Sequence, residues 1–166
     1  MGGDLVASDF DEVFASVYPR ARAVALRILD SVPDAEDAAA EGLARALADW
    51  PRVSRLPYRE AWILRVTINA SIDMARQRGR ETYEGTQPTS SDDASVLRMT
   101  MVTALSALPR RQREAIVLRH LAGFSERDVA AALGVSQNTA KKHLQRGMQR
   151  LRSGFGTTEG AAIGFD

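Results

Sequence analysis

Apolar residues recur at intervals of three and four along almost the whole chain, and this spacing constrains the fold more than any other feature. It places one apolar stripe on each helix, whereas a half-buried strand would need strict alternation of apolar and polar residues. Prolines that break or start helices divide the chain into separate stretches: Pro33, Pro51, Pro57 and Pro109. The sequence therefore predicts an all-α protein.

Three helices are expected in the first half of the chain. The first has the apolar positions Phe10, Val13, Phe14, Val17, Ala21, Val24 and Ile28. The second follows a break at residues 30–33, ends at Pro51, and has the apolar positions Ala39, Leu43, Ala46, Leu47 and Trp50. The third begins after Pro57, reaches about Arg78, and has the apolar positions Trp62, Val66, Ala70 and Met74. Together they predict one helical domain over residues 1–79.

Residues 80–95 lose the helical period and are rich in Gly, Pro, Ser, Thr and Asp. This composition predicts a flexible linker. Fully extended, the segment would reach about 50 Å, so tethering rather than packing is expected to relate the parts on either side. Residues 96–152 then predict a second small helical domain, and residues 153–166 a flexible tail.

The net charge of +1 conceals an uneven distribution, because residues 108–152 hold ten Lys and Arg against three Asp and Glu. Such a basic segment is typical of a module that contacts a polyanion. The chain has no cysteine, which excludes disulfides and thiolate metal sites. No apolar run approaches the roughly 20 residues of a membrane helix. A cytoplasmic protein without membrane insertion is expected.

Residues 121–152 carry the most specific signal, that of a helix-turn-helix. Ser125 and Asp128 have the spacing of a capping box, which begins a short helix. Gly134 supplies the turn, and Ser136 caps a second helix whose buried positions are Ala140, Leu144, Met148 and Leu151. The spacing predicts that this second helix enters a major groove.

The outer face of the second helix is basic and polar, with no acidic residue between positions 129 and 152. The residues predicted to contact DNA are Gln137, Asn138, Lys141, Lys142, Gln145 and Arg146, with Arg119 on the preceding helix. Arg119, Arg146 and Arg150 suit phosphates, whereas Gln137, Lys141, Lys142 and Gln145 suit base edges. The competing interpretation is a helical hairpin with a solvated basic surface.

Four carboxylates cluster at the start of the second expected helix: Asp34, Glu36, Asp37 and Glu41. Three interpretations compete for them. Oxygen-only metal sites normally need a wrapping loop or a substrate phosphate, which disfavours a metal. A solvated acidic first turn is favoured by the helix dipole. The third interpretation is a docking face for a basic or helical partner.

Asn69, Asp73 and Arg76 share one face of the third helix, and Arg78 and Arg80 follow. Polar and cationic side chains in this order suit exposed bases and a phosphate strand. A capped, solvated helix end explains them equally well. The two histidines, His120 and His143, lie too far apart in the sequence to indicate a metal or catalytic pair.

Taken together, residues 9–152 resemble an extracytoplasmic-function (ECF) type sigma factor of bacterial RNA polymerase, in the sigma-70 superfamily. The resemblance implies that Asp34, Glu36, Asp37 and Glu41 bind core polymerase. It implies that the helix from Trp62 to Arg80 recognises the −10 element, with Asn69 capturing a flipped base. It implies that the segment Leu108–Glu114 and the helix-turn-helix bind the −35 element.

This resemblance implies a specificity subunit, not an enzyme, with no catalytic residue, metal or cofactor. Its expected partners are core RNA polymerase and promoter DNA, and the presence of an anti-sigma factor is left open. The alternative functions are a stand-alone helix-turn-helix regulator and a protein-interaction adapter. The chain departs from the family pattern at Ala39 and Ala40 in the acidic helix, and at Ala140, Lys142 and His143 in the recognition helix.

Overall fold

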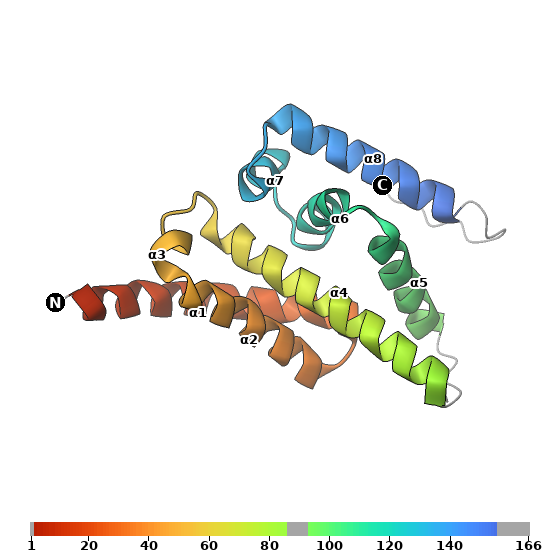
Figure 1. The fold of residues 1–166 in the computed structure, drawn as a ribbon, viewed down its shortest axis with the longest axis horizontal. Coiled ribbons are helices and arrows are strands. Elements are labelled where there is room, and N and C mark those ends of the chain that lie inside the picture. The colour runs from red at the N-terminus through yellow and green to blue at the C-terminus, as the bar shows by residue number, and fades with distance from the viewer. Residues whose placement is uncertain (1, 86–92, 156–166) are drawn as a thin grey trace.

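The computed structural model describes residues 2–85 and 93–155, and every regular element in these ranges is helical (Figure 1). The prediction of an all-α fold is confirmed. The elements are α1 (Gly2–Leu29), α2 (Val32–Ala48), α3 (Trp50–Val53), α4 (Arg59–Gly85), α5 (Asp93–Ala107), α6 (Arg110–Ile116), the π-helical segment η1 (Val117–Leu121), α7 (Glu126–Leu133) and α8 (Gln137–Phe155).

Helices α1, α2 and α4 pack on one another and form the N-terminal group. Ser31 caps α2, since its hydroxyl accepts a hydrogen bond from the backbone N–H of Asp34 at 3.5 Å. The inner face of α2 consists mainly of small residues: Ala35, Ala38, Ala39, Gly42 and Ala46. Because these side chains are short, the backbone of α2 lies close to that of α4. A Cβ atom on Gly42 would lie 3.3 Å from the carbonyl oxygen of Ile63.

Helix α4 buries a different side from the one expected. Trp62, Val66, Ala70 and Met74 are only half-buried. The fully buried side chains are Ala61, Ile63, Leu64, Thr67, Ile68, Ser71 and Ile72. The prediction was wrong because α4 packs on more than one side and two buried positions are polar. The Ser71 hydroxyl is satisfied within the helix, where it donates to the carbonyl of Thr67 at 2.8 Å.

Two other apolar positions assigned to buried faces are exposed. Phe14 is 42 % exposed and stacks on Tyr18, with ring centroids 5.3 Å apart. Leu47 is 53 % exposed on the outer side of α2. Trp50 is buried as expected, but it begins α3, because α2 ends at Ala48 rather than at Pro51.

Helices α6, α7 and α8, with η1, form the C-terminal group. The α6–α8 crossing is close at Gly147, where a Cβ atom would lie 2.9 Å from the Ile116 side chain. Helix α5 contacts both α4 and α8, so it lies between the two groups. The arrangement confirms two small helical units, the second containing the helix-turn-helix.

The expectation that a tether rather than packing relates the two units was wrong. Helix α4 contacts α5, η1 and α7 directly, and it lies on the side of the N-terminal group that faces the C-terminal group (Figure 1). The predicted linker of residues 80–95 also contains helical segments, because α4 continues to Gly85 and α5 begins at Asp93. Residues 86–92 of that segment, and residues 156–166 of the predicted tail, lie outside the described residues.

Candidate nucleic-acid interface

The turn between α7 and α8 has the local structure that the sequence predicts. The Ser125 hydroxyl accepts a hydrogen bond from the backbone N–H of Asp128 at 3.1 Å, and the Asp128 carboxylate accepts one from the backbone N–H of Ser125 at 3.4 Å. Gly134 ends α7 with φ of 66°, in the left-handed region. Ser136 caps α8 by accepting from the backbone N–H of Thr139 at 3.1 Å.

Removing the cap of α7 is expected to weaken the C-terminal group. Ser125→Ala should cost about 1 kcal/mol of unfolding free energy near neutral pH. The hydrogen bond from the Ser125 hydroxyl lowers the pKa of the Asp128 carboxyl below its usual range. The stabilisation of the fold by the Asp128 carboxylate is therefore present above about pH 4, and it is lost as the pH falls through the lowered pKa of this group. Urea unfolding followed by circular dichroism, at neutral pH and below about pH 4, measures both effects.

Ser153→Ala serves as the matched control, because the Ser153 hydroxyl donates only to the carbonyl of Gln149 within α8. Its cost should stay within about 0.5 kcal/mol. A Ser125→Ala cost equally small near neutral pH would contradict the role of the cap.

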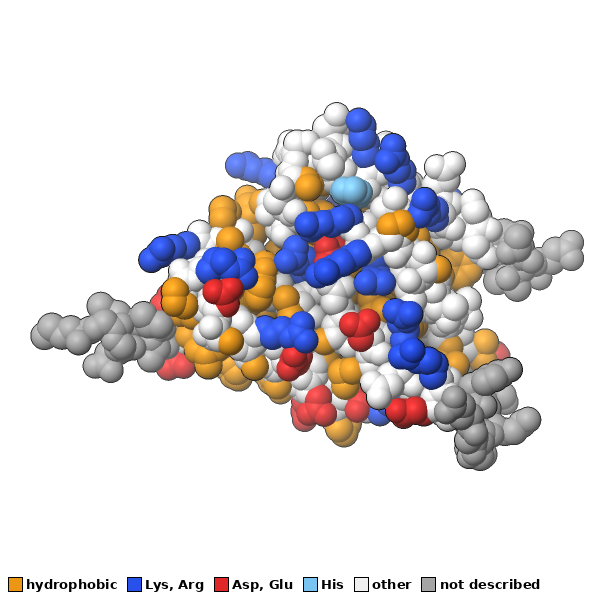
Figure 2. Space-filling model, in the orientation of Figure 1, with side chains coloured by type: hydrophobic (Ala, Val, Ile, Leu, Met, Phe, Trp, Pro, Cys, Tyr) orange, Lys and Arg blue, Asp and Glu red, His pale blue; other side chains and the backbone are white. Residues whose placement is uncertain are grey.

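The outer face of α8 is open to solvent. Its exposed polar and basic residues are Gln137, Asn138, Lys141, Lys142, Gln145, Arg146, Arg150 and Arg152. Figure 2 shows Lys and Arg side chains over the upper and middle parts of this face, including the part where α8 lies, and Asp and Glu side chains in the middle and along the lower edge, near α2. The helix therefore presents a basic surface without nearby carboxylates of its own.

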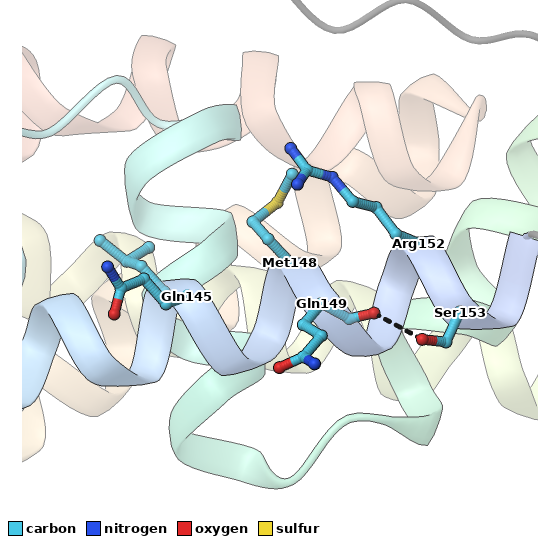
Figure 3. A pocket seen from close by; sticks show the side chains of 6 residues that line it. Gln145, Met148, Gln149, Arg152 and Ser153 are labelled. Carbon is cyan, nitrogen blue, oxygen red and sulfur yellow. Dashed lines mark hydrogen bonds between the residues drawn. The ribbon is translucent and has the colours of Figure 1, made fainter.

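A hollow runs along the second half of α8 and is lined by Leu144, Gln145, Met148, Gln149, Arg152 and Ser153 (Figure 3). All of its lining residues belong to this one helix. Pockets for small molecules are usually enclosed by several elements. We therefore interpret the hollow as a shallow depression in the basic surface and not as a pocket for a small molecule.

Arg119 and His120 lie on η1, beside the helix-turn-helix, and both are exposed. The Arg119 guanidinium donates to the carbonyl of Phe124 at 2.9 Å, which holds it along the loop before α7. Partial loss of water around the His120 ring, and then the charge of Arg119, lower the pKa of His120 below its usual value. The neutral form of His120 therefore predominates at pH 7, so this side chain adds little charge to the surface.

Three of the four predicted carboxylates on α2 form ion pairs. Glu36 pairs with Arg22 at 3.0 Å and Glu41 pairs with Arg45 at 2.6 Å. Asp34 pairs with Arg78 of α4. Asp37 is exposed and makes no ion pair with any residue that the structure describes.

Two exposed apolar residues, neither of them predicted to be exposed from the sequence, lie on the same outer side of α2. Val32 is 46 % exposed, and Leu47 is exposed at the other end of the helix. The spacing of positions 32, 36, 40 and 47 places them on one face with Glu36. Helical spacing alone could have placed both residues on the exposed side. Leu47, however, also fits the spacing of the buried apolar positions.

Asn69 lies at the contact between the two groups. Its side chain is half-buried, and Nδ2 donates to Oε1 of Glu114 on α6 at 3.0 Å. Asp73, Arg76 and Arg80 are exposed on α4. These residues were expected near a helix end, but α4 extends to Gly85 and places them within the helix.

The structure describes no group of three His, Asp or Glu side chains that could hold a metal ion. None of its described helices combines the length and apolar content of a membrane span.

Comparison with protein-family models gives two matches in sequence order. Residues 13–81 match sigma-70 region 2, and residues 98–151 match sigma-70 region 4. The first range contains the acidic cluster of α2 and Asn69, and the second contains the helix-turn-helix.

Several curated proteins are similar over most of the chain. The RNA polymerase sigma-E factor of Streptomyces coelicolor is 34% identical, over 81% of this chain and 82% of its own length. The ECF RNA polymerase sigma factor SigE of Mycolicibacterium smegmatis is 30% identical over 91% of this chain. The chain spans 63% of that protein, and 37% of an uncharacterized protein of Rhizobium meliloti that is also 30% identical.

Two solved structures have a similar fold. One is the sigma factor RpoE in complex with the anti-sigma factor NepR from Bartonella quintana, with a TM-score of 0.54 and 27% identity over 91% of this chain and 99% of that one. The other is CnrH in complex with the cytosolic domain of CnrY, with a TM-score of 0.58 and 21% identity over 93% of this chain and 97% of that one.

Proposed function

The chain belongs to the ECF-type sigma factors of the sigma-70 family, and from this premise we propose that it binds core RNA polymerase and directs transcription initiation at specific promoters. The observation that carries the proposal is the order of regions 2 and 4 in one chain, combined with the exposed basic face of α8. In this role the protein acts in the cytoplasm as a specificity subunit and catalyses no reaction itself.

The outer face of α2 is the proposed docking surface for core polymerase. It combines the carboxylates Asp34, Glu36, Asp37 and Glu41 with exposed apolar side chains at both ends of the helix. Asp37, which forms no ion pair within the described residues, is available to a cation of the partner. Val32 and Leu47 would add apolar contact area, which favours association when it is removed from water.

The proposed DNA contacts divide between α4 and α8. On α4, Asn69, Asp73, Arg76, Arg78 and Arg80 would contact the melted −10 strand. Asn69 would hold a base that has left the stack, which costs a few kcal/mol for the base. On α8 and η1, Arg119, Gln137, Asn138, Lys141, Lys142, Gln145 and Arg146 would contact the −35 duplex, with phosphates setting position and base edges setting preference.

We include an anti-sigma factor among the proposed partners, because RpoE of Bartonella quintana and CnrH were solved in complex with NepR and the cytosolic domain of CnrY. Such a partner would compete with polymerase or promoter DNA for the surfaces described above.

Co-elution of the purified chain with sigma-free core polymerase in size-exclusion chromatography tests the proposal directly. Run-off transcription on fragmented GC-rich genomic DNA should then give new, discrete transcripts. A folded chain that does not bind core polymerase, but binds duplex DNA tightly, would instead be a stand-alone helix-turn-helix regulator. A chain that binds neither would be an interaction adapter.

Replacing two carboxylates of the docking surface is expected to weaken polymerase binding. Asp37→Ala with Glu41→Ala should raise the dissociation constant about tenfold, since rim charges each contribute about 0.5–1 kcal/mol. Fluorescence anisotropy with labelled protein and core polymerase measures this change. Asp11→Ala with Glu12→Ala, on exposed positions of α1, is the control with the same change of charge. If the two pairs of substitutions weakened binding equally, the assignment of the docking surface to α2 would be contradicted.

A further inference from the structure

Two arginines from distant parts of the chain lie at the C-terminal end of α7. Arg65 of α4 donates to the carbonyl of Ala132 at 3.2 Å, and Arg111 of α6 donates to the carbonyl of Leu133 at 3.3 Å. These carbonyls belong to the last two residues of α7, where the helix dipole favours a cation. One helix end therefore holds two guanidinium groups at consecutive carbonyls.

A third arginine lies beside them on α6. Arg110 Nε lies 3.0 Å from Oε1 of Glu114, and Arg111 Nη1 lies 3.5 Å from Oε2 of the same carboxylate. The dipole of α7 does not account for Arg110, whose ion-pair partner within the described residues is Glu114. We call Arg65, Arg110 and Arg111 the arginine cluster.

The arginine cluster holds more positive charge than its surroundings neutralise. Its three cations meet one carboxylate, that of Glu114, which leaves two positive charges. Loss of water around the Arg65 guanidinium lowers its pKa, and the charge of Glu114 opposes this shift. The charges of three other arginines add to the lowering: Arg111, Arg110 and Arg52. An anion placed among these groups would relieve their mutual repulsion.

Each guanidinium of the cluster also has unused hydrogen-bond donors. An arginine side chain carries five N–H donors on three nitrogen atoms. Within the described residues, Arg65 and Arg111 donate only from Nη1, and Arg110 donates only from Nε. The side chains of Arg110 and Arg111 are 73 % and 52 % exposed, so an anion can approach them from solvent. Planar guanidinium groups match the oxygen atoms of phosphate.

The cluster is separate from the proposed −35 surface on α8. Gln112 and Ile116 face α8, because a Cβ atom on Gly147 would lie 3.5 Å from the Gln112 Cβ and 2.9 Å from the Ile116 side chain. Arg110 and Glu114 precede these two residues by two positions, which places them about 200° away around α6. Figure 2 shows Lys and Arg side chains in the middle of this face, where α6 lies in Figure 1. A duplex bound on the outer face of α8 does not explain these cations.

The positions of the three guanidinium groups favour an extended anion over a single small one. Each group is held by its own acceptor: the carbonyl of Ala132 for Arg65, that of Leu133 for Arg111, and Glu114 for Arg110. One orthophosphate therefore cannot use the free donors of all three. A chain of adjacent phosphate groups offers several charges and many acceptor oxygens in a short length, as the cluster requires.

We propose that the arginine cluster binds a free anion with adjacent phosphate groups, either an inorganic oligophosphate or the phosphate chain of a nucleotide. The anion would lie against α4, α6 and the end of α7, where it would neutralise the excess charge. This binding site goes beyond the proposed sigma function and needs neither polymerase nor promoter DNA.

Isothermal titration calorimetry of the purified full chain with inorganic tripolyphosphate tests the site. The titration is done in about 0.15 M salt, with a chelator that removes divalent cations. We expect one tripolyphosphate for each chain, bound at least about tenfold more tightly than orthophosphate. Equal affinities for the two anions, or no binding of tripolyphosphate, would overturn the proposal.

Single substitutions locate the bound anion. Arg65→Gln and Arg110→Gln should each weaken tripolyphosphate binding about tenfold, because each removes charge-assisted hydrogen bonds. Arg55→Gln is the matched control, since the Arg55 side chain is exposed and loses the same charge; its effect should stay below about twofold. If Arg150→Gln on α8 weakened binding as much as Arg110→Gln does, the anion would lie on α8 and the proposal would fail.

Far-UV circular dichroism checks the folding of each variant. Arg110→Gln provides the test if Arg65→Gln unfolds, because the Arg110 side chain is largely exposed. Arginine side-chain ¹H–¹⁵N spectra give a second readout for the unsubstituted chain. Tripolyphosphate should shift the Nε–Hε signals of Arg65 and Arg110, assigned from the single variants, more than that of Arg150. A larger shift at Arg150 would contradict the site.

Two further titrations identify the source of the phosphate groups. ATP that binds no more tightly than tripolyphosphate would support an inorganic chain as the ligand, and tighter binding of ATP would support a nucleotide. A fluorescein-labelled single-stranded 20-mer, random at every position, is titrated by anisotropy. Its affinity should change less than about twofold in Arg110→Gln. A loss as large as that for tripolyphosphate would make the cluster a nucleic-acid contact and overturn the proposal.

These readouts are independent of the sigma function. A chain that does not bind core polymerase but binds tripolyphosphate at the cluster would refute the proposed function and keep the anion site. A chain that binds polymerase and gives no tripolyphosphate binding would do the opposite.

Discussion

Replacing Lys141 and Arg146 together by alanine is expected to lower the affinity of the chain for a −35 duplex about a hundredfold. Both side chains are exposed on α8, and each contact to a phosphate or base edge contributes about 1–3 kcal/mol. If the basic residues at positions 141, 142, 146, 150 and 152 meet phosphates, the log–log salt slope of the wild type should be about −4. The double variant should have a slope less negative by about two.

Fluorescence anisotropy at several salt concentrations measures both quantities, on a duplex taken from a promoter found by run-off transcription. Arg55→Ala with Arg45→Ala is the control, since it removes two exposed arginines from the N-terminal group. Binding to core polymerase should be unchanged in the Lys141 and Arg146 variant. If that variant instead lost polymerase binding and kept its duplex affinity, the proposed roles of the two domains would be reversed.

Replacing Gly42 by alanine is expected to destabilise the N-terminal group by about 2 kcal/mol. Alanine is intrinsically better than glycine in a helix by about 1 kcal/mol. Here, however, its Cβ would overlap the Thr67 side chain and approach the carbonyl oxygen of Ile63 to 3.3 Å. A backbone carbonyl cannot rotate away as a side chain can, so the two helices must separate. Such overpacking typically costs 1–3 kcal/mol or more.

Gly79→Ala is the matched control, because nothing lies within 4 Å of the Cβ it would add to α4. It should stabilise the same group by about 0.5–1 kcal/mol. Tryptophan fluorescence during urea unfolding reports on this group alone, since the only two tryptophans of the chain are Trp50 and Trp62. Equal effects of the two substitutions would contradict the close crossing of α2 and α4.

The helix-turn-helix was predictable almost residue by residue because its signals are local. The pairing of Ser125 with Asp128, the left-handed turn at Gly134 and the cap at Ser136 each act over no more than four residues. Helix starts after a capping serine or a proline were predictable for the same reason. The exposed face of α8 followed from its period, since polar and basic residues there share one side.

Features that depend on packing between distant segments were not predictable. The side of α4 that is buried depends on which helices cover it, so the apolar positions Trp62 and Val66 are less buried than Thr67 and Ser71. Glu114 stands in a segment of arginines that suits solvent, but its side chain is buried, where Arg110 and Arg111 pair with it and Asn69 of α4 donates a hydrogen bond to it. The pairing of Asn69 with Glu114 joins residues 45 positions apart, which no local pattern records.

The two sides of helix α2 meet different requirements. The inner side must pack against α4, and the outer side is proposed to bind a partner. Its inner side is fixed by small residues at the crossing with α4, where even a methyl group at Gly42 does not fit. On its outer side, Asp37 forms no ion pair within the described residues and Leu47 is largely exposed, so packing does not fix the side chain at either position. Substitutions can therefore diversify partner choice on this helix without disturbing the fold, which makes it the natural place to engineer factors that recognise different polymerases and do not cross-react.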